Sequence, residues 1–389
     1  MARLTVTRWF LLLTAGAGLA VAQAPAPAPA PVRVPPTRPS APQLWPVTRL
    51  RQTDWIDVRD IAARFGLTAA WSRSEQAMTL SDARGVRLVF ETRQRDFHLD
   101  GLRIFLGEPV LGEKGTLWVT KLDVIKLVAP LLRPADRLEQ LPVAAPRTIV
   151  LDPGHGGNDP GKENRRLGVN EKTCTLDVAL RLKPRLEALG WRVLLTRTED
   201  RELAAGKKSD LQLRDDFANR NQADLFLSIH FNSVEHDAGR VTGVEVYTMT
   251  PQFMNSAGEE RVDDMTNVAY PGNRFDYASL LFGAQLHRAM HATLQTPDRG
   301  FKRGRLAVLR MLDCPGALVE CAYLSNDAEA RRVATPEFRE KIAQALAEGV
   351  QAYAAQLAAL RGTPVAPPAP KPAAPATATP QPAGPVPGR

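Results

Sequence analysis

The chain has 389 residues, of which 44% are hydrophobic, and it carries a formal net charge of +8. This length predicts about two domains plus tails, and the hydrophobic fraction is sufficient for a sizeable core. A moderately basic chain suits an anionic polymer as its partner. Nucleic acid is excluded as that polymer, because the sequence contains no basic–aromatic stripe and no nucleic-acid-binding module.

The first 22 residues have the pattern of a secretory signal peptide. Arg3 and Arg8 form a basic region, residues 9–19 are mostly apolar, and Ala20-Val21-Ala22 provides a cleavage site of small residues. The apolar stretch is too short and wrongly flanked for a membrane span, and an uncleaved anchor is the alternative. Because no other long apolar run follows, we expect a soluble periplasmic or secreted protein with no membrane span after cleavage. Export also argues against a nucleic-acid partner.

Two segments rich in proline and alanine flank the rest of the chain. Residues 23–43 and 361–389 together hold 18 of the 32 prolines (8 and 10). Segments of this composition cannot form a packed core. We therefore expect an extended linker on the N-terminal side and a disordered tail on the C-terminal side.

Residues 44–135 are predicted to form a small α+β unit. Val58, Ile61 and Phe65 have helical spacing, and Gly66 is a typical helix stop. The other predicted elements are strands at 77–80, 86–90, 103–106 and around 110, and a second helix at 122–131. The pattern resembles the small N-terminal domain of copper amine oxidases, which also precedes many wall enzymes. A wall-binding or positioning role is one interpretation, and a passive structural unit is the other.

Residues 147–360 are predicted to form a larger unit in which strands alternate with helices. The predicted strands lie at 148–151, 192–196, 224–230, 243–248, 307–310 and 317–323, and the predicted helices at 171–189, 211–221, 277–294 and 336–360. This alternation is typical of an α/β fold, with a mostly parallel or mixed sheet and helices on both faces.

Three apolar strands of the larger unit run into residues that can bind a metal or carry a proton. These residues are His155, His230 and Glu320, and Glu171 stands in the first turn of the helix that follows His155. Because the carboxyl ends of parallel strands gather at one edge of a sheet, we expect the four side chains to lie close together.

A catalytic zinc ion needs three nitrogen or oxygen ligands and an open position for water. We therefore predict His155, Glu171 and His230 as ligands, and Glu320 as the carboxylate that takes a proton from the attacking water and returns it to the leaving amine. Each residue alone has an ordinary explanation, such as a turn histidine or a glutamate favoured by the helix dipole. A buried, unpaired Glu320 would be costly, however, and the four together outweigh these separate explanations.

Other histidines carry less weight. His287 and His291 lie four apart on one predicted helix, but without a third ligand nearby, packing or surface exposure is the favoured interpretation. His98 is expected at the surface of the small unit. His236 is expected to line the cleft at most.

Two arginines and three cysteines have structural interpretations. Arg197 and Arg214 are expected to tie strand ends to a helix through ion pairs, with substrate contact as the alternative. The cysteine count is odd, and Cys314 and Cys321 are spaced so that they could pair. Buried free thiols are the favoured interpretation for Cys174 and for that pair.

Six segments of the larger unit occur together and in a recognisable order: 151–157, 170–172, 194–197, 223–233, 243–247 and 318–326. In this respect, residues 147–355 resemble zinc-dependent N-acetylmuramoyl-L-alanine amidases of the type 3 class. The resemblance implies Zn²⁺ held by His155, Glu171 and His230, with Glu320 as the catalytic carboxylate. It also implies a periplasmic peptidoglycan hydrolase, acting in wall turnover or cell separation, that cleaves the amide between N-acetylmuramic acid and L-alanine.

Two other functions stay open at this point. One is a different zinc wall peptidase, such as a carboxypeptidase or an endopeptidase. The other is a non-catalytic wall-binding or regulatory protein, which the loss of any ligand would have favoured.

The polar segment 250–276 lies where some relatives of this class carry an insertion that covers the zinc ion until a partner removes it. Between residues 259 and 264 it contains four carboxylates, Glu259, Glu260, Asp263 and Asp264. A lid on which an activator protein acts is one hypothesis. A solvated surface loop is the favoured one.

Overall fold

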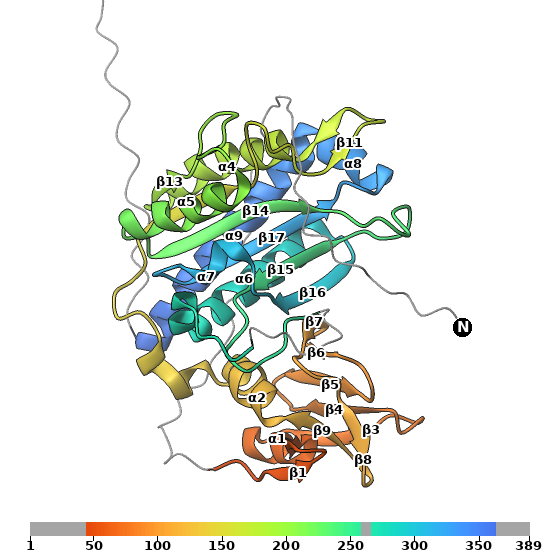
Figure 1. The fold of residues 1–389 in the computed structure, drawn as a ribbon. Helices are drawn as coiled ribbons and strands as arrows, with labels where there is room; N and C mark the ends of the chain where they lie inside the picture. The colour runs from red at the N-terminus through yellow and green to blue at the C-terminus, as the bar shows by residue number, and fades with distance from the viewer. Residues whose placement is uncertain (1–43, 258–265, 363–389) are drawn as a thin grey trace, which may run out of the picture.

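The computed structural model describes residues 44–257 and 266–362 (Figure 1). The predicted signal peptide, the 23–43 linker and the tail from residue 363 lie outside these residues, and so do the four carboxylates of the 250–276 segment. Those expectations stay predictions. Among the described helices, none combines the length and the apolar character needed to cross a membrane.

Eleven strands of the described residues form one mixed sheet (Figure 1). In spatial order they are β13 (Arg192–Leu195), β10 (Thr148–Pro153), β14 (Leu225–Asn232), β17 (Gly316–Tyr323), β15 (Val244–Thr248), β16 (Asp298–Arg303), β7 (Leu102–Phe105), β6 (Asp96–Leu99), β5 (Arg87–Glu91), β4 (Ala77–Ser81) and β3 (Thr68–Trp71). The first four are parallel, and β15 pairs with β17 in the antiparallel direction. The predicted mixed sheet is therefore confirmed.

The sheet runs without interruption from the larger unit into the small one. β16 and β7 pair in parallel at Phe301 and Ile104. Beyond β7 the strands form an antiparallel meander that belongs wholly to the small unit. No sequence pattern predicts this pairing, because the two strands lie almost 200 residues apart and nothing local specifies their contact.

Helices cover both faces of the sheet in the larger unit, as predicted. On one face lie α4 (Glu171–Ala188), α6 (Asp276–Leu294) and α9 (Pro336–Arg361), and on the other lie α5 (Lys207–Arg220) and α7 (Ala307–Arg310) (Figure 1). Because side chains alternate along a strand, Ile149 and Leu151 join the core beneath the first three helices. Val150 packs on the opposite face with Ala218 and Leu309.

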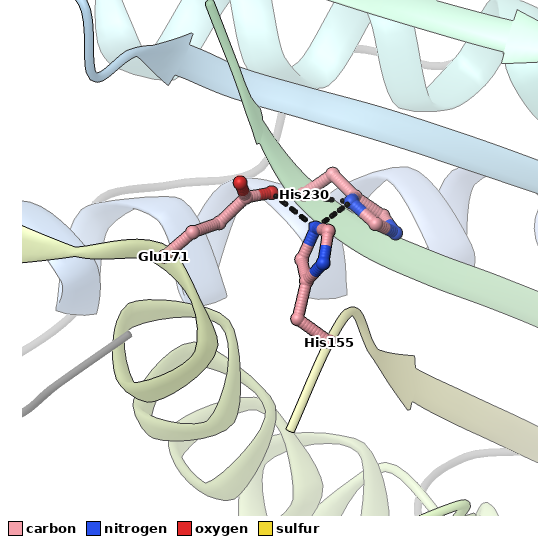
Figure 2. Close-up of side chains that lie close together, drawn as sticks. All are labelled: His155, Glu171 and His230. Atoms are coloured by element: carbon pink, nitrogen blue, oxygen red, sulfur yellow. Dashed lines mark hydrogen bonds and ion pairs between the residues drawn. The ribbon is translucent and has the colours of Figure 1, made fainter. Parts of the chain in front are cut away.

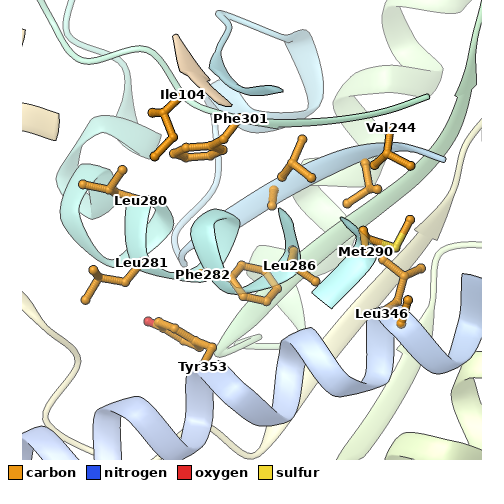
Figure 3. Packing of buried hydrophobic residues seen from close by; sticks show 14 of the residues in the cluster. Ile104, Val244, Leu280, Leu281, Phe282, Leu286, Met290, Phe301, Leu346 and Tyr353 are labelled. Atoms are coloured by element: carbon orange, nitrogen blue, oxygen red, sulfur yellow. The ribbon is translucent and has the colours of Figure 1, made fainter. Parts of the chain in front are cut away.

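The main core continues across the junction between the two units. Figure 3 shows Phe301 beside Ile104, and in the same core the Phe282 ring of α6 lies 5.3 Å from that of Tyr353 on α9. A Cβ atom at Gly283 would stand 2.6 Å from the Phe301 ring, so α6 approaches the junction closely only because this position is glycine. Fully burying a large apolar side chain contributes about 1.5–3 kcal/mol. The units therefore share core packing as well as a sheet.

A second sheet and the helices of the small unit also contribute buried residues to this core. The second sheet has the order β1 (Thr48–Leu50), β2 (Thr53–Asp57), β9 (Thr116–Thr120) and β8 (Leu111–Glu113). The helix predicted before Gly66 is α1 (Val58–Phe65); the Asp57 side chain accepts the Arg59 N–H at its start, and Gly66 ends it with φ 67°. The second predicted helix is a continuous run of α2 (Lys121–Asp123), a π-helical turn η1 (Val124–Val128) and α3 (Ala129–Leu132), followed by the 3₁₀ helix η2 (Pro134–Gln140).

Four short elements complete the larger unit. The two-residue strands β11 (Glu163–Asn164) and β12 (Val169–Asn170) pair with each other and return the chain to the start of α4. A 3₁₀ helix, η3 (Pro271–Phe275), precedes α6, and α8 (Asp327–Ala334) precedes α9.

The strand predicted at 307–310 is wrong, because these residues form the helix α7. A short apolar run does not distinguish a strand from a buried helical turn. The strand is instead β16, at 298–303, whose polar sequence DRGFKR concealed it. Its charged residues lie on both faces of the sheet: Asp298 and Arg303 contact α6, whereas Lys302 pairs with Glu245 on the other face.

Candidate metal centre

Three side chains from separate elements converge on one point (Figure 2). His155 follows β10, Glu171 is the first residue of α4, and His230 lies in β14. The ligand atoms are His155 Nε2, Glu171 Oε1 and His230 Nδ1, and each lies 3.1 Å from the other two. The structure thus brings together the three residues that the sequence predicted as ligands.

The spacing of these atoms fits a small cation. A tetrahedral zinc site with bonds of about 2.0–2.1 Å places neighbouring ligand atoms about 3.3 Å apart. Two imidazole nitrogens and one carboxylate oxygen are also the donors typical of catalytic zinc, which leaves a fourth position open. The residues present therefore fit the ion that the resemblance implies.

Glycines let the His155 loop come close to the strand beside it. A Cβ atom at Gly154 would lie 2.3 Å from the His230 ring, and one at Gly156 would lie 2.1 Å from the Arg201 carbonyl oxygen. His155 itself has φ 66°, in the left-handed region that few side-chain-bearing residues adopt. The glycines of the Pro-Gly-His-Gly-Gly sequence are therefore needed for the close approach of the loop to His230 as well as for the turn.

Two buried arginines, Arg214 and Arg197, hold the His155 loop in place. Arg214 forms ion pairs with Asp152 and Asp210, each at 2.8 Å, and donates to the His155 carbonyl oxygen at 2.9 Å. Arg197 instead donates to backbone carbonyl oxygens, including that of Gly154 at 2.9 Å. Burial lowers the pKa of Arg197 to about 10, with repulsion from Arg214 as a further cause. The ion-pair prediction is confirmed for Arg214, whereas the Arg197 side chain binds the backbone carbonyl oxygens of the loop.

Further hydrogen bonds orient the ligands. The second ring nitrogen of His155, Nδ1, lies 3.0 Å from Asp159 Oδ2, which leaves Nε2 directed at the centre. Glu171 accepts the Lys162 N–H at 2.8 Å and the Phe231 N–H at 2.9 Å. Sequence reasoning missed Asp159, although a carboxylate four residues after a ligand histidine is a usable signal, because such partners commonly fix the ring of a metal-binding histidine.

The charges around His155 favour a cation at this point. Burial opposes protonation of the ring, but Glu171 and Asp159 outweigh it and raise the pKa of His155 to about 9. For His230, burial is the larger effect and lowers the pKa despite the contact with Glu171. The negative charges of Glu171 and Asp159, which favour a proton on His155, also favour a metal ion at the same point.

Replacing Asp159 by asparagine is expected to weaken zinc binding by about 10- to 100-fold, because the charged partner that orients His155 is lost. Zinc affinity would be measured by competition with a chromogenic chelator. The matched control is Asp237→Asn, an exposed loop position. An Asp159→Asn protein that binds zinc as tightly as the control would contradict this role.

Glu320 lies beside the three ligands without joining them. It is paired in register with His230 on the neighbouring strand, and its Oε2 atom is buried with no hydrogen-bond partner among the described residues. Burial, followed by the negative charges of Glu171 and Glu245, raises the pKa of Glu320 well above its ordinary range. A raised pKa makes the carboxylate a stronger base, which suits a group that accepts a proton and later returns it.

The remaining candidates lie away from the centre. His287 is buried on α6 and its Nε2 lies 2.7 Å from Asp298 Oδ1, which agrees with a packing role, whereas His98 and His236 are exposed. Cys174, Cys314 and Cys321 are free and buried, so the free-thiol interpretation is confirmed.

Comparison with known proteins places the larger unit among wall amidases. Residues 149–352 match the family model described as N-acetylmuramoyl-L-alanine amidase. The N-acetylmuramoyl-L-alanine amidase AmiC of Neisseria meningitidis is 34% identical over 228 residues, covering 53% of this chain and 52% of the relative. The N-acetylmuramoyl-L-alanine amidase LytC of Bacillus subtilis is 32% identical over 206 residues, covering 53% and 35%.

A solved structure gives a similar extent of match. The catalytic domain of CwlV, an N-acetylmuramoyl-L-alanine amidase from Bacillus (Paenibacillus) polymyxa var. colistinus, is 27% identical, covers 53% of this chain and 97% of that chain, and has a TM-score of 0.42. The two curated relatives are longer than their matched parts, since the chain spans about half of one and a third of the other.

Proposed function

The chain belongs to the N-acetylmuramoyl-L-alanine amidase family, and from that premise we propose that it is a zinc-dependent peptidoglycan hydrolase. The bond cleaved is the amide between the lactyl group of N-acetylmuramic acid and L-alanine of the stem peptide. The observation that carries this proposal is the convergence of His155, Glu171 and His230 to 3.1 Å beside Glu320, whose buried Oε2 atom has no hydrogen-bond partner among the described residues.

In this mechanism, His155, Glu171 and His230 would hold the zinc ion. When bound, zinc would polarise the scissile carbonyl and would lower the pKa of a water molecule to about 7. The Glu320 carboxylate accepts the proton of the attacking water as the new carbon–oxygen bond forms. Glu320 then gives this proton to the alanine nitrogen as the carbon–nitrogen bond breaks, so the products are a free carboxyl group and a free amine.

The cellular setting is part of the proposal. The predicted signal peptide supports export to the periplasm or beyond, where peptidoglycan lies, with action in wall turnover or cell separation. The small unit is proposed to bind the wall or to position the enzyme on it. An activator protein acting on the 250–276 segment stays a hypothesis that rests on the sequence.

Digestion of purified sacculi with the mature protein tests the function. We expect intact stem peptides with a free L-alanine amine, identified by mass, and no release after treatment with a chelator. A wall carboxypeptidase or endopeptidase would instead cut within the peptides. Sacculi that are bound and left uncut would favour the non-catalytic reading and would contradict the proposal.

A further inference from the structure

A row of paired residues on one face of the sheet leads from the metal centre towards the small unit. His230 lies in register with Glu320, Glu320 with Glu245, and Glu245 with Gly300 on β16. Residues paired in this way point to the same face of a sheet. Neighbouring strands are about 4.8 Å apart, so Gly300 lies two strands, or about 10 Å, from Glu320.

Arg299 is the extra residue of a β-bulge in this row. The pairing of β16 with β15 loses register between Asp298 and Gly300. Bulges re-aim side chains and are frequent next to active sites. Here the Arg299 guanidinium lies 3.8 Å from Glu245 and 5.8 Å from the centre of the Tyr323 ring, on the face that carries Glu320. The bulge thus turns a cation towards the site face.

The Glu245 carboxylate accepts its hydrogen bonds from donors other than Arg299. It accepts four hydrogen bonds, from Lys302 at 2.7 Å, the Tyr247 and Tyr323 hydroxyls at 2.5 Å each, and Asn232 at 3.1 Å. Four is about the capacity of a carboxylate. At 3.8 Å, Arg299 is beyond hydrogen-bond distance of Glu245, and its Nε–H has no partner among the described residues. Arg299 therefore keeps an Nε–H donor that Glu245 does not take up.

Phe105 of the small unit packs against Lys302 and Gly300 of β16. The Lys302 ammonium lies 4.9 Å from the centre of the Phe105 ring and 5.6 Å from that of Tyr247. A Cβ atom at Gly300 would stand 2.7 Å from the Phe105 ring, so this ring lies directly on β16. Phe105 belongs to β7 of the small unit. Contacts from both units therefore hold Lys302 against Glu245, while the Arg299 side chain remains 38% exposed to a ligand.

We propose that Arg299 binds a carboxylate on the peptide arm of the substrate and so selects substrates with an acidic residue close to the cleaved bond. This inference rests on the proposed function. An extended peptide advances about 3.3–3.6 Å per residue, so about three residues span the roughly 10 Å from Glu320 to Gly300, the neighbour of Arg299. A guanidinium matches a carboxylate with two parallel hydrogen bonds, which makes arginine the residue suited to this recognition.

The test compares two soluble muramyl peptides that differ only in whether the peptide carboxylates are free or amidated. For the free-carboxylate substrate, Arg299→Ala is expected to raise KM about 10- to 100-fold with little change in kcat, because one charge-assisted contact is lost. The preference for the free carboxylate should disappear as well. Arg299→Lys should lie between, since it keeps the charge and loses the paired geometry. Arg192→Ala, an exposed strand arginine on β13, removes the same charge and should behave as wild type.

A binding measurement separates this inference from the proposed function. Calorimetry would measure how tightly the free-carboxylate peptide binds to two inactive proteins, Glu320→Gln alone and Glu320→Gln combined with Arg299→Ala. The melting temperatures of both proteins would be checked in parallel. Equal binding, or an Arg299→Ala enzyme that keeps the preference, overturns the role of Arg299 and leaves amide hydrolysis intact. Weaker binding without any hydrolysis by the wild-type protein would contradict the proposed function and support Arg299. If Arg299→Ala does not fold, Arg299→Lys decides by the same two measurements.

Discussion

Replacement of Glu320 by glutamine is expected to lower kcat on peptidoglycan by about 100- to 10,000-fold, the usual contribution of general acid–base catalysis. Glutamine has the same shape but can neither accept nor return the proton. Because Glu320 lies next to His230 without joining the three ligand atoms, zinc content should stay at one ion per chain. Rates would be followed by the release of free L-alanine amines, and zinc by elemental analysis.

The matched control is Glu235→Gln, at an exposed position in the loop after β14. It makes the same chemical change close in sequence to His230 and should keep wild-type rates. A Glu320→Gln enzyme as fast as this control would refute proton transfer by Glu320. Loss of zinc in Glu320→Gln would show instead that Glu320 supports the ligands.

Replacement of His230 by alanine is expected to abolish both tight zinc binding and hydrolysis. Only His155 and Glu171 would remain, and two donors do not hold zinc in the manner of a three-ligand site. Zinc affinity should fall by more than about 100-fold, since loss of an outer hydrogen-bond partner alone costs 10- to 100-fold. Dialysis against a weak chelator followed by elemental analysis would measure this loss.

His98→Ala serves as the control for this change, because His98 is exposed on β6 of the small unit. It should keep both zinc and activity. A His230→Ala protein that retains one tightly bound zinc ion after dialysis would show that the metal binds elsewhere. Recovery of part of the activity in excess zinc would agree with weakened binding and an otherwise intact site.

Local patterns were sufficient for the elements that carry the ligands. The apolar runs before His155 and His230 mark buried strands, and Glu171 opens a helix whose first turn favours a carboxylate. These signals lie within a few residues of the side chains concerned. The same kind of local evidence failed at 307–310, where a short apolar stretch fits a helical turn as well as a strand.

Other features depend on residues that are distant in sequence. Arg299 carries no local mark of function, since a charged residue in a polar stretch is usually a solvated one. Its direction follows from a bulge against β15, and its Nε–H stays available because other donors already surround Glu245. The pairing of β16 with β7, which brings Phe105 onto Gly300, is equally invisible in either segment alone.

The sequence by itself predicted the fold class, the three side chains that converge at the candidate metal centre and the nearby carboxylate, because each is encoded by the periodicity and the ends of a single strand or helix. Only the tertiary structure decided the register of Glu320 against Glu245, the continuous sheet between the two units, and the aim of Arg299. These depend on pairing between strands, whose free energy comes from contacts that form only when distant segments meet.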